Sequence, residues 1–243
     1  MARVPTVVDV AVATRTARPS TTRTLWSSTI GKKAVMAVTG VIMLLFLIVH
    51  MLGNLKIFFG APDFNAYAAW LRTIGEPVLH RSWYLWVQRV GLVVCVVLHA
   101  VCAYQLSRRD LRARDQRYAH SGPAGSSLAT RTMRWGGVII LLFLVWHILD
   151  LTTGTLNPLG EAGHPYQNIV ADFQNWWANV IYIVAMAALG LHIRHGVWSA
   201  AQTLGANGPR SGPILRTASW VLGLVLFAGF VTVPVAVMTG AVH

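Results

Sequence analysis

The sequence predicts an all-α integral membrane protein with five transmembrane helices. The 243-residue chain is 55% hydrophobic and only 12% charged, whereas soluble domains carry about 25% charged residues. Five apolar runs each reach the roughly 20 residues that a helix needs to cross a bilayer. Basic residues are concentrated in alternate connecting segments, a distribution that is typical of membrane proteins with a fixed orientation.

The chain divides into a short tail and one transmembrane domain. Residues 1–30 are expected to form a cytoplasmic tail, and residues 31–243 the five-helix domain. The tail has no apolar core followed by a small-residue cleavage site, so it is not expected to be a secretory signal. The spans are predicted at about residues 33–54, 83–106, 135–153, 177–199 and 214–239.

The positive charge is distributed by side of the membrane, which argues against binding to nucleic acid. The net charge is +12, yet no Lys or Arg occurs from Trp135 to Leu191. The positive-inside rule therefore places the N-terminus and residues 108–134 inside, and residues 60–81, residues 150–174 and the C-terminus outside. Three basic residues lie on the wrong side: Lys56, Arg72 and Arg81.

Each of the first four spans contains a histidine, and one short segment is repeated. "LLFLIVHML" (Leu44 to Leu52) returns 97 positions later as "LLFLVWHIL", with six of nine residues identical, including the histidine. Measured from the inner end of its helix at 1.5 Å per residue, His50 lies about 25 Å along and His147 about 20 Å along. Both are thus expected toward the outer face. His99 and His192, on helices of the opposite direction, are expected toward the inner face.

Two imidazoles that face each other across a bundle are suitable axial ligands for a haem iron. The first four helices are therefore predicted to form a cofactor-binding bundle with two redox centres at two depths. A single membrane histidine is as often only a hydrogen-bonding group between helices, but four at paired depths make that explanation weaker. In "LGLHIRHGVWSAAQTLG", His192 and His195 share one helix face, so spacing alone does not choose the ligand.

The chain from about Leu25 onward resembles the single-chain, two-haem cytochrome b anchor of bacterial succinate dehydrogenase or fumarate reductase, respiratory complex II. The motifs that carry the resemblance are "GKKAVMAVTGVIMLLFLIVHMLGNLKIFFG", "FNAYAAWLR", "VVLHAVCAYQL", "RTMRWGGVIILLFLVWHILDL" and "LHIRHGVWSAAQTLG". In that family the fourth ligand is followed four residues later by glycine, which selects His192 over His195. The resemblance implies two haem b groups, held by His99 with His192 and by His50 with His147.

The resemblance also implies partners and a location. The partners are a flavoprotein subunit, an iron–sulfur subunit and a lipid quinone, menaquinone in most such bacteria. The protein would then be a multi-pass protein of the bacterial cell membrane, surrounded by lipid, that passes electrons to quinone and carries no flavin chemistry itself. The resemblance leaves both a single complex and a higher oligomer of the complex as alternatives. Haem propionates need cationic or hydrogen-bonding partners, for which Arg89, Arg194 and His195 are the candidates.

Two cysteines leave an alternative cofactor open. Cys95, His99 and Cys102 fall on one face of the second helix, and a Rieske-type [2Fe–2S] cluster uses two Cys and two His. The two cysteines are about 10 Å apart along an ideal helix, so both reach one iron only if the helix breaks. Two further functions remain as alternatives: a haem b carrier for another dehydrogenase, and a transporter or proton channel that uses histidines as relays.

Overall fold

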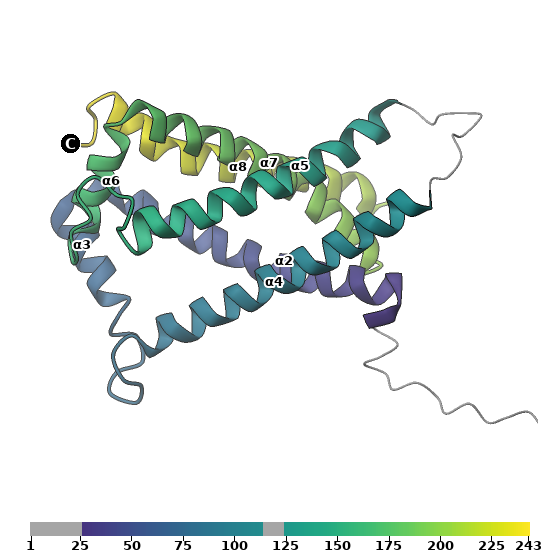
Figure 1. Cartoon of the computed structure of the whole chain (residues 1–243), viewed down its shortest axis with the longest axis horizontal. Helices are drawn as coiled ribbons and strands as arrows, with labels where there is room; N and C mark the ends of the chain where they lie inside the picture. Colours follow the sequence, from purple (N-terminus) through teal and green to yellow (C-terminus); the bar gives the residue numbers. More distant parts are fainter. Residues whose placement is uncertain (1–25, 114–123) are drawn as a thin grey trace, which may run out of the picture.

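The computed structural model describes residues 26–113 and 124–243, and the side chains of residues 124–131 are not described. Long helices run along the molecule (Figure 1), and the described residues contain no strand. The predicted all-α fold class is therefore confirmed. Five helices are long and apolar enough to cross a membrane, and they are α2 (Thr29–Asn54), α4 (Trp83–Arg112), α5 (Ala124–His147), α7 (Trp176–Thr203) and α8 (Ser211–Met238).

Each predicted span corresponds to one of these helices, and most of the helices extend beyond it. α2 begins at Thr29, within the predicted tail, because Ser28 caps it: the Ser28 hydroxyl accepts the Gly31 backbone N–H at 2.9 Å, as N-cap residues do. α4 continues through the basic residues to Arg112, since Arg is a good helix former. The predicted tail otherwise lies outside the described residues.

Short elements that were not predicted close one end of the bundle, next to the C-terminus (Figure 1). They are η1 (Leu55–Phe59), α3 (Ala61–Trp70), the π-helical turn η2 (Ile148–Thr152) and α6 (Pro165–Phe173). Their buried side chains, such as Ile57, Phe64 and Phe173, form an apolar cluster with residues of α7 and α8. We call this the cap end, and the opposite end, where Thr29 and Arg112 lie, the basic end.

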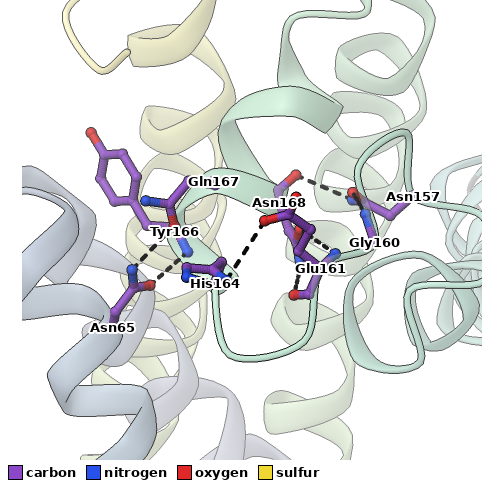
Figure 2. A network of polar contacts seen from close by, with 8 residues as sticks. All are labelled: Asn65, Asn157, Gly160, Glu161, His164, Tyr166, Gln167 and Asn168. Carbon is purple, nitrogen blue, oxygen red and sulfur yellow. Dashed lines mark hydrogen bonds and ion pairs between the residues drawn. The ribbon is translucent and has the colours of Figure 1, made fainter.

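Polar contacts fasten the cap together (Figure 2). The Tyr166 backbone N–H donates to Asn65 Oδ1 at 3.0 Å, and Asn65 Nδ2 donates to Gln167 Oε1 at 3.1 Å, which ties α6 to α3. Asn157 Nδ2 donates to the Asn168 carbonyl at 3.1 Å and so ties the preceding loop to α6. These contacts fix α6 against the end of the bundle and thereby position the residues that α6 directs inward.

The long helices pack around α2 and α7. α2 contacts α4, α7 and α8, while α7 contacts α5 and α8. α7 and α8 approach closely at two glycines: a Cβ added to Gly223 would lie 2.6 Å from the Gly190 carbonyl oxygen. Small residues allow this close backbone approach in membrane helices. Gly190 is thus a helix-packing residue, whereas a Cβ at Gly196 would meet no atom within 4 Å.

Candidate functional site

The four bundle histidines meet in two pairs. Nearer the basic end, His99 on α4 faces His192 on α7 with ring centroids 6.2 Å apart. Nearer the cap end, His50 on α2 faces His147 on α5 with ring centroids 6.1 Å apart. The pairing is the one predicted from helix direction and depth.

The separation of each pair is suitable for one metal ion between two imidazoles. Imidazole–metal bonds of about 2.0 Å and a ring radius of about 1.1 Å would place the two ring centroids about 6.2 Å apart. The observed separations are 6.1 and 6.2 Å. All four histidines are partly exposed. The spacing of each imidazole pair therefore fits one metal ion held between two helices.

At the basic-end pair, one ring nitrogen of His99 is already engaged. His99 Nδ1 lies 3.1 Å from the Met36 carbonyl oxygen and 3.3 Å from Thr39 Oγ1. A carbonyl only accepts, so this contact assigns the proton to Nδ1 and leaves the Nε2 lone pair free. His192 Nδ1 is buried without a hydrogen-bond partner among the described residues. Such an unpaired buried atom is uncommon in proteins.

At the cap-end pair, His147 begins a chain of hydrogen bonds. His147 Nδ1 lies 3.0 Å from the Tyr182 hydroxyl, and this hydroxyl donates to Asp150 Oδ2 at 3.3 Å. Because Tyr182 gives its proton to the carboxylate, His147 Nδ1 is the donor to Tyr182 and its Nε2 is again free. Metal-binding histidines typically donate their other ring N–H in this way to a carbonyl or carboxylate, which fixes the ring orientation.

Two glycines missed at the sequence level face the histidines of the basic-end pair. A Cβ at Gly40 on α2 would lie 3.5 Å from His99 Cε1, and one at Gly137 on α5 would lie 3.8 Å from His192 Cε1. The repeat extends to these glycines: "GVIMLLFLIVH" starts at Gly40, "GVIILLFLVWH" starts at Gly137, and eight of eleven positions agree. Each copy thus spans both pairs, which lie about 15 Å apart along the helix axis.

The cap end also buries two carboxyls. Asp150, on the π-helical turn, is 1% exposed, and Asp172, on α6, is 0% exposed. Burial, together with the neighbouring Asp150 charge, raises the pKa of Asp172 to about 7. Neither Asp172 nor Tyr182 was predicted from the sequence to be a site residue. Their partners are distant in sequence, so no local motif identifies them.

The predicted propionate partners contact aromatic rings or each other in this structure. Arg89 is exposed, and its guanidinium lies 5.3 Å from the Trp86 ring. Arg194 packs on the Trp220 ring of α8 at 3.8 Å, and its Nη1 donates to His195 Nε2 at 3.3 Å. His195 therefore contacts Arg194, whereas His192 faces His99. The propionate role of these residues stays a prediction.

The two cysteines lie in the contact between α4 and α2. Cys95 and Cys102 are the buried residues of α4, and α4 packs against α2. α4 is continuous from Trp83 to Arg112, so the helix break that would bring both thiols to one iron is not observed. Within the described ranges, no three His, Cys, Asp or Glu residues gather into a metal-binding group.

The fold and the site together define a class: a multi-pass helical membrane protein with two facing-imidazole pairs at two levels of one bundle. Comparisons of the chain with protein-family models, curated proteins and solved structures gave no match.

Proposed function

We propose that this chain is the membrane anchor and electron-transfer subunit of a succinate:quinone oxidoreductase, with two haem b groups held by its imidazole pairs. The observation that carries the proposal is the presence of two such pairs, with ring centroids 6.1 and 6.2 Å apart. Two ligands per centre suit haem, because the porphyrin supplies the other four. When bound, haem supplies reversible one-electron transfer.

The chain's own residues have a structural role in this function. His99 and His147 each present a free Nε2, because Met36 and Tyr182 engage the Nδ1 atoms. Gly40 and Gly137 keep the volume beside the basic-end rings free of side chains. The two pairs lie about 15 Å apart along α2 and α5. The bundle thus holds both imidazole pairs in fixed positions along one line across the membrane.

A [2Fe–2S] cluster in place of haem is the alternative that the cysteines raise. It needs two thiolates on one iron and two imidazoles on the other. The continuous α4 separates Cys95 from Cys102 by about 10 Å along its axis. The two imidazole pairs use all four bundle histidines without a thiolate, which favours haem.

The basic end is suited to docking an acidic partner. Arg108, Arg109 and Arg112 project from the last turns of α4 and, with Lys32, line a pocket of about 240 Å³. Arg109 also donates to Thr29 Oγ1 at 3.3 Å, which fixes it against the start of α2. We assign this end to the cytoplasmic side, where the iron–sulfur and flavoprotein subunits would dock, and the cap end to the outer side. Menaquinone is the proposed electron acceptor.

The test is to purify the tagged chain from its native membrane and add succinate. The proposal expects co-purification of a flavoprotein that oxidises succinate and, on addition of succinate, reduction of a b-type spectrum. A haem b carrier for another dehydrogenase would co-purify with a different flavoprotein and would stay oxidised with succinate. A transporter or proton channel would show no b-type absorption even after dithionite, and that result would reject the proposal.

A further inference from the structure

The two buried carboxyls of the cap end, Asp150 and Asp172, lie within hydrogen-bonding reach of each other. One comes from the π-helical turn after α5 and the other from the last turn of α6. Their exposed fractions are 1% and 0%. Two ionised carboxylates in such contact would repel each other strongly, because burial reduces the screening by water.

The hydrogen bonds show which carboxyl carries charge. Asp150 Oδ1 accepts from Asn157 Nδ2 at 3.4 Å, and Asp150 Oδ2 accepts from the Tyr182 hydroxyl at 3.3 Å. Neither oxygen of Asp172 meets an N–H or O–H donor among the described residues. A carboxylate only accepts hydrogen bonds, whereas a protonated carboxyl also donates one. A proton on Asp172, donated to Asp150, satisfies both groups.

In the part of the chain that the structure describes, no Lys or Arg acts on Asp172 to neutralise a second negative charge. α7 contributes Tyr182, η2 contributes Asp150, and α8 and α3 contribute apolar side chains to the neighbouring cluster, such as Val233 and Phe64. Among the described residues, Asp150 is the charged group that acts on Asp172. The surroundings thus favour one negative charge on the pair over two.

We infer that Asp150 and Asp172 form a proton-binding site, in which one shared proton is held between the two carboxyls and exchanged as the charge at the His50/His147 pair changes. The exchange rests on the proposed function, whereas the shared proton does not. Tyr182 connects the two sites, since its hydroxyl contacts both His147 Nδ1 and Asp150 Oδ2.

The coupled step balances in charge. A negative charge added at the His50/His147 pair, as one electron on a bound haem would be, would favour uptake of one proton by the carboxyl pair from the water at the cap end. Loss of that charge, with the electron passed to quinone, would favour release of the proton to the same side. No bond between heavy atoms forms or breaks.

The upward shift of the Asp172 pKa agrees with a role in proton exchange. Burial and the Asp150 charge raise the pKa of Asp172 to about 7, so near neutral pH a modest change in local charge shifts its proton occupancy. Neighbouring carboxyls titrate as a pair, and the measurable quantity is therefore the proton uptake of the pair.

The experiment combines infrared spectroscopy with redox titration of the complex at pH 6 to 8. The variants are Asp172→Asn and Asp150→Asn, with Glu161→Gln as matched control, because Glu161 is an exposed carboxyl of the same cap. We expect the wild type and the control to show a protonated-carboxyl band at pH 6 that is sensitive to deuterium exchange, Asp172→Asn to lose this band, and Asp150→Asn to shift its frequency because the hydrogen-bond partner of Asp172 changes. Two variants are used so that a folding failure of one leaves the other to decide.

The redox titration tests the exchange. In the wild type, the reduction potential of the centre at the cap end should fall as pH rises. The redox equilibrium should change by up to tenfold per pH unit, which is about 59 mV for one electron. Asp172→Asn should flatten this slope and leave the haem content unchanged. Absence of the carboxyl band in the wild type would overturn the shared proton, and equal slopes in all proteins would overturn the exchange. A protein with the band but no haem would instead refute the proposed function.

Discussion

Each of the four paired histidines should be required for one redox centre and not for the other. If His50 and His147 hold one centre and His99 and His192 the other, replacement of any one by Ala should reduce the haem content from two to one per chain. The double variant at His50 and His147 should lose no more than either single variant, because both residues serve one centre. A pyridine haemochrome assay measures the content.

The matched control for these variants is His195→Ala. His195 contacts Arg194 rather than a partner imidazole, so this variant should retain two haems. Loss of one haem in His195→Ala, with full content in His192→Ala, would show that the ligand was assigned to the wrong histidine of α7.

Asp172 should make the stability of the cap depend on pH in a predictable direction. Its pKa is raised from 3.8 to about 7, so the folded state retains a proton that the unfolded state releases. The contribution of Asp172 to the free energy of unfolding is therefore fully present below pH 4 and is lost as pH rises through 7. This loss amounts to at most about 4 kcal/mol.

Asp172→Asn stays neutral at every pH and should remove this loss. We expect its apparent melting temperature in detergent to fall less than that of the wild type between pH 5 and pH 8. Glu161→Gln serves as control and should follow the wild type. A wild type whose melting temperature rises across this range would contradict the assignment, because a carboxyl stabilised in its ionised form gives the opposite sign.

At the residue scale, the sequence indicated the metal-ligand candidates but not the residues that orient them. The histidines stand out because imidazoles are rare in long apolar runs. Asp150 can also be recognised in the sequence, as a carboxylate at the end of a span. Tyr182 and Asp172 cannot be recognised in this way, because a tyrosine in a span and an aspartate in a loop are common. Only the folded chain shows that both residues lie beside Asp150.

The π-helical turn η2 explains how α5 serves two purposes at the cap end. Thr153 N–H bonds to the Ile148 carbonyl at 2.8 Å, five residues back. Such wider turns often occur at functional sites. His147 ends the regular helix and faces the bundle, and the turn then directs Asp150 toward Tyr182.

The contact between α7 and α8 should be sensitive to a single methyl group. A Cβ at Gly190 would lie 3.0 Å from the Gly223 carbonyl oxygen, and one at Gly223 would lie 2.6 Å from that of Gly190. Gly223→Ala should therefore separate the helices and destabilise the protein by about 1–3 kcal/mol. Thermal unfolding followed by circular dichroism measures the change.

Gly196→Ala is the control on the same pair of helices. A Cβ there meets no atom within 4 Å, and Ala is the better helix former, so this variant should be neutral or stabilising. Equal destabilisation by both variants would show that the close approach at Gly223 is not the cause.

At the element scale, long helices were predictable and short ones were not. Five apolar runs of sufficient length predict five spans, because the bilayer requires that length. α3 and α6 have ten and nine residues, too few to be stable alone. They form because Phe64, Tyr166 and Phe173 pack on the ends of the long helices, and this packing joins segments about 100 residues apart.

The whole molecule should be oriented with the basic end in the cytoplasm. Because the described residues contain five candidate spans, the start of α2 and the end of α8 are expected on opposite sides of the membrane. The C-terminal residue contacts the cap, where Tyr166 donates to the His243 carbonyl at 3.1 Å. A reporter that is active only outside the cytoplasm should therefore be active when fused after His243 and inactive when fused within residues 108–134. The reverse pattern would contradict the assigned orientation.

The group held between the two imidazoles of each pair decides whether the proposed function is correct. The deciding measurement is the amount of haem b, total iron and acid-labile sulfide per purified chain, taken together with a reduced-minus-oxidised spectrum. After subtraction of the iron and sulfide of the soluble subunits, we predict about two haems per chain, each with one iron, and no remaining sulfide. Two irons and two sulfides without haem, or no redox-active group at all, would contradict the account.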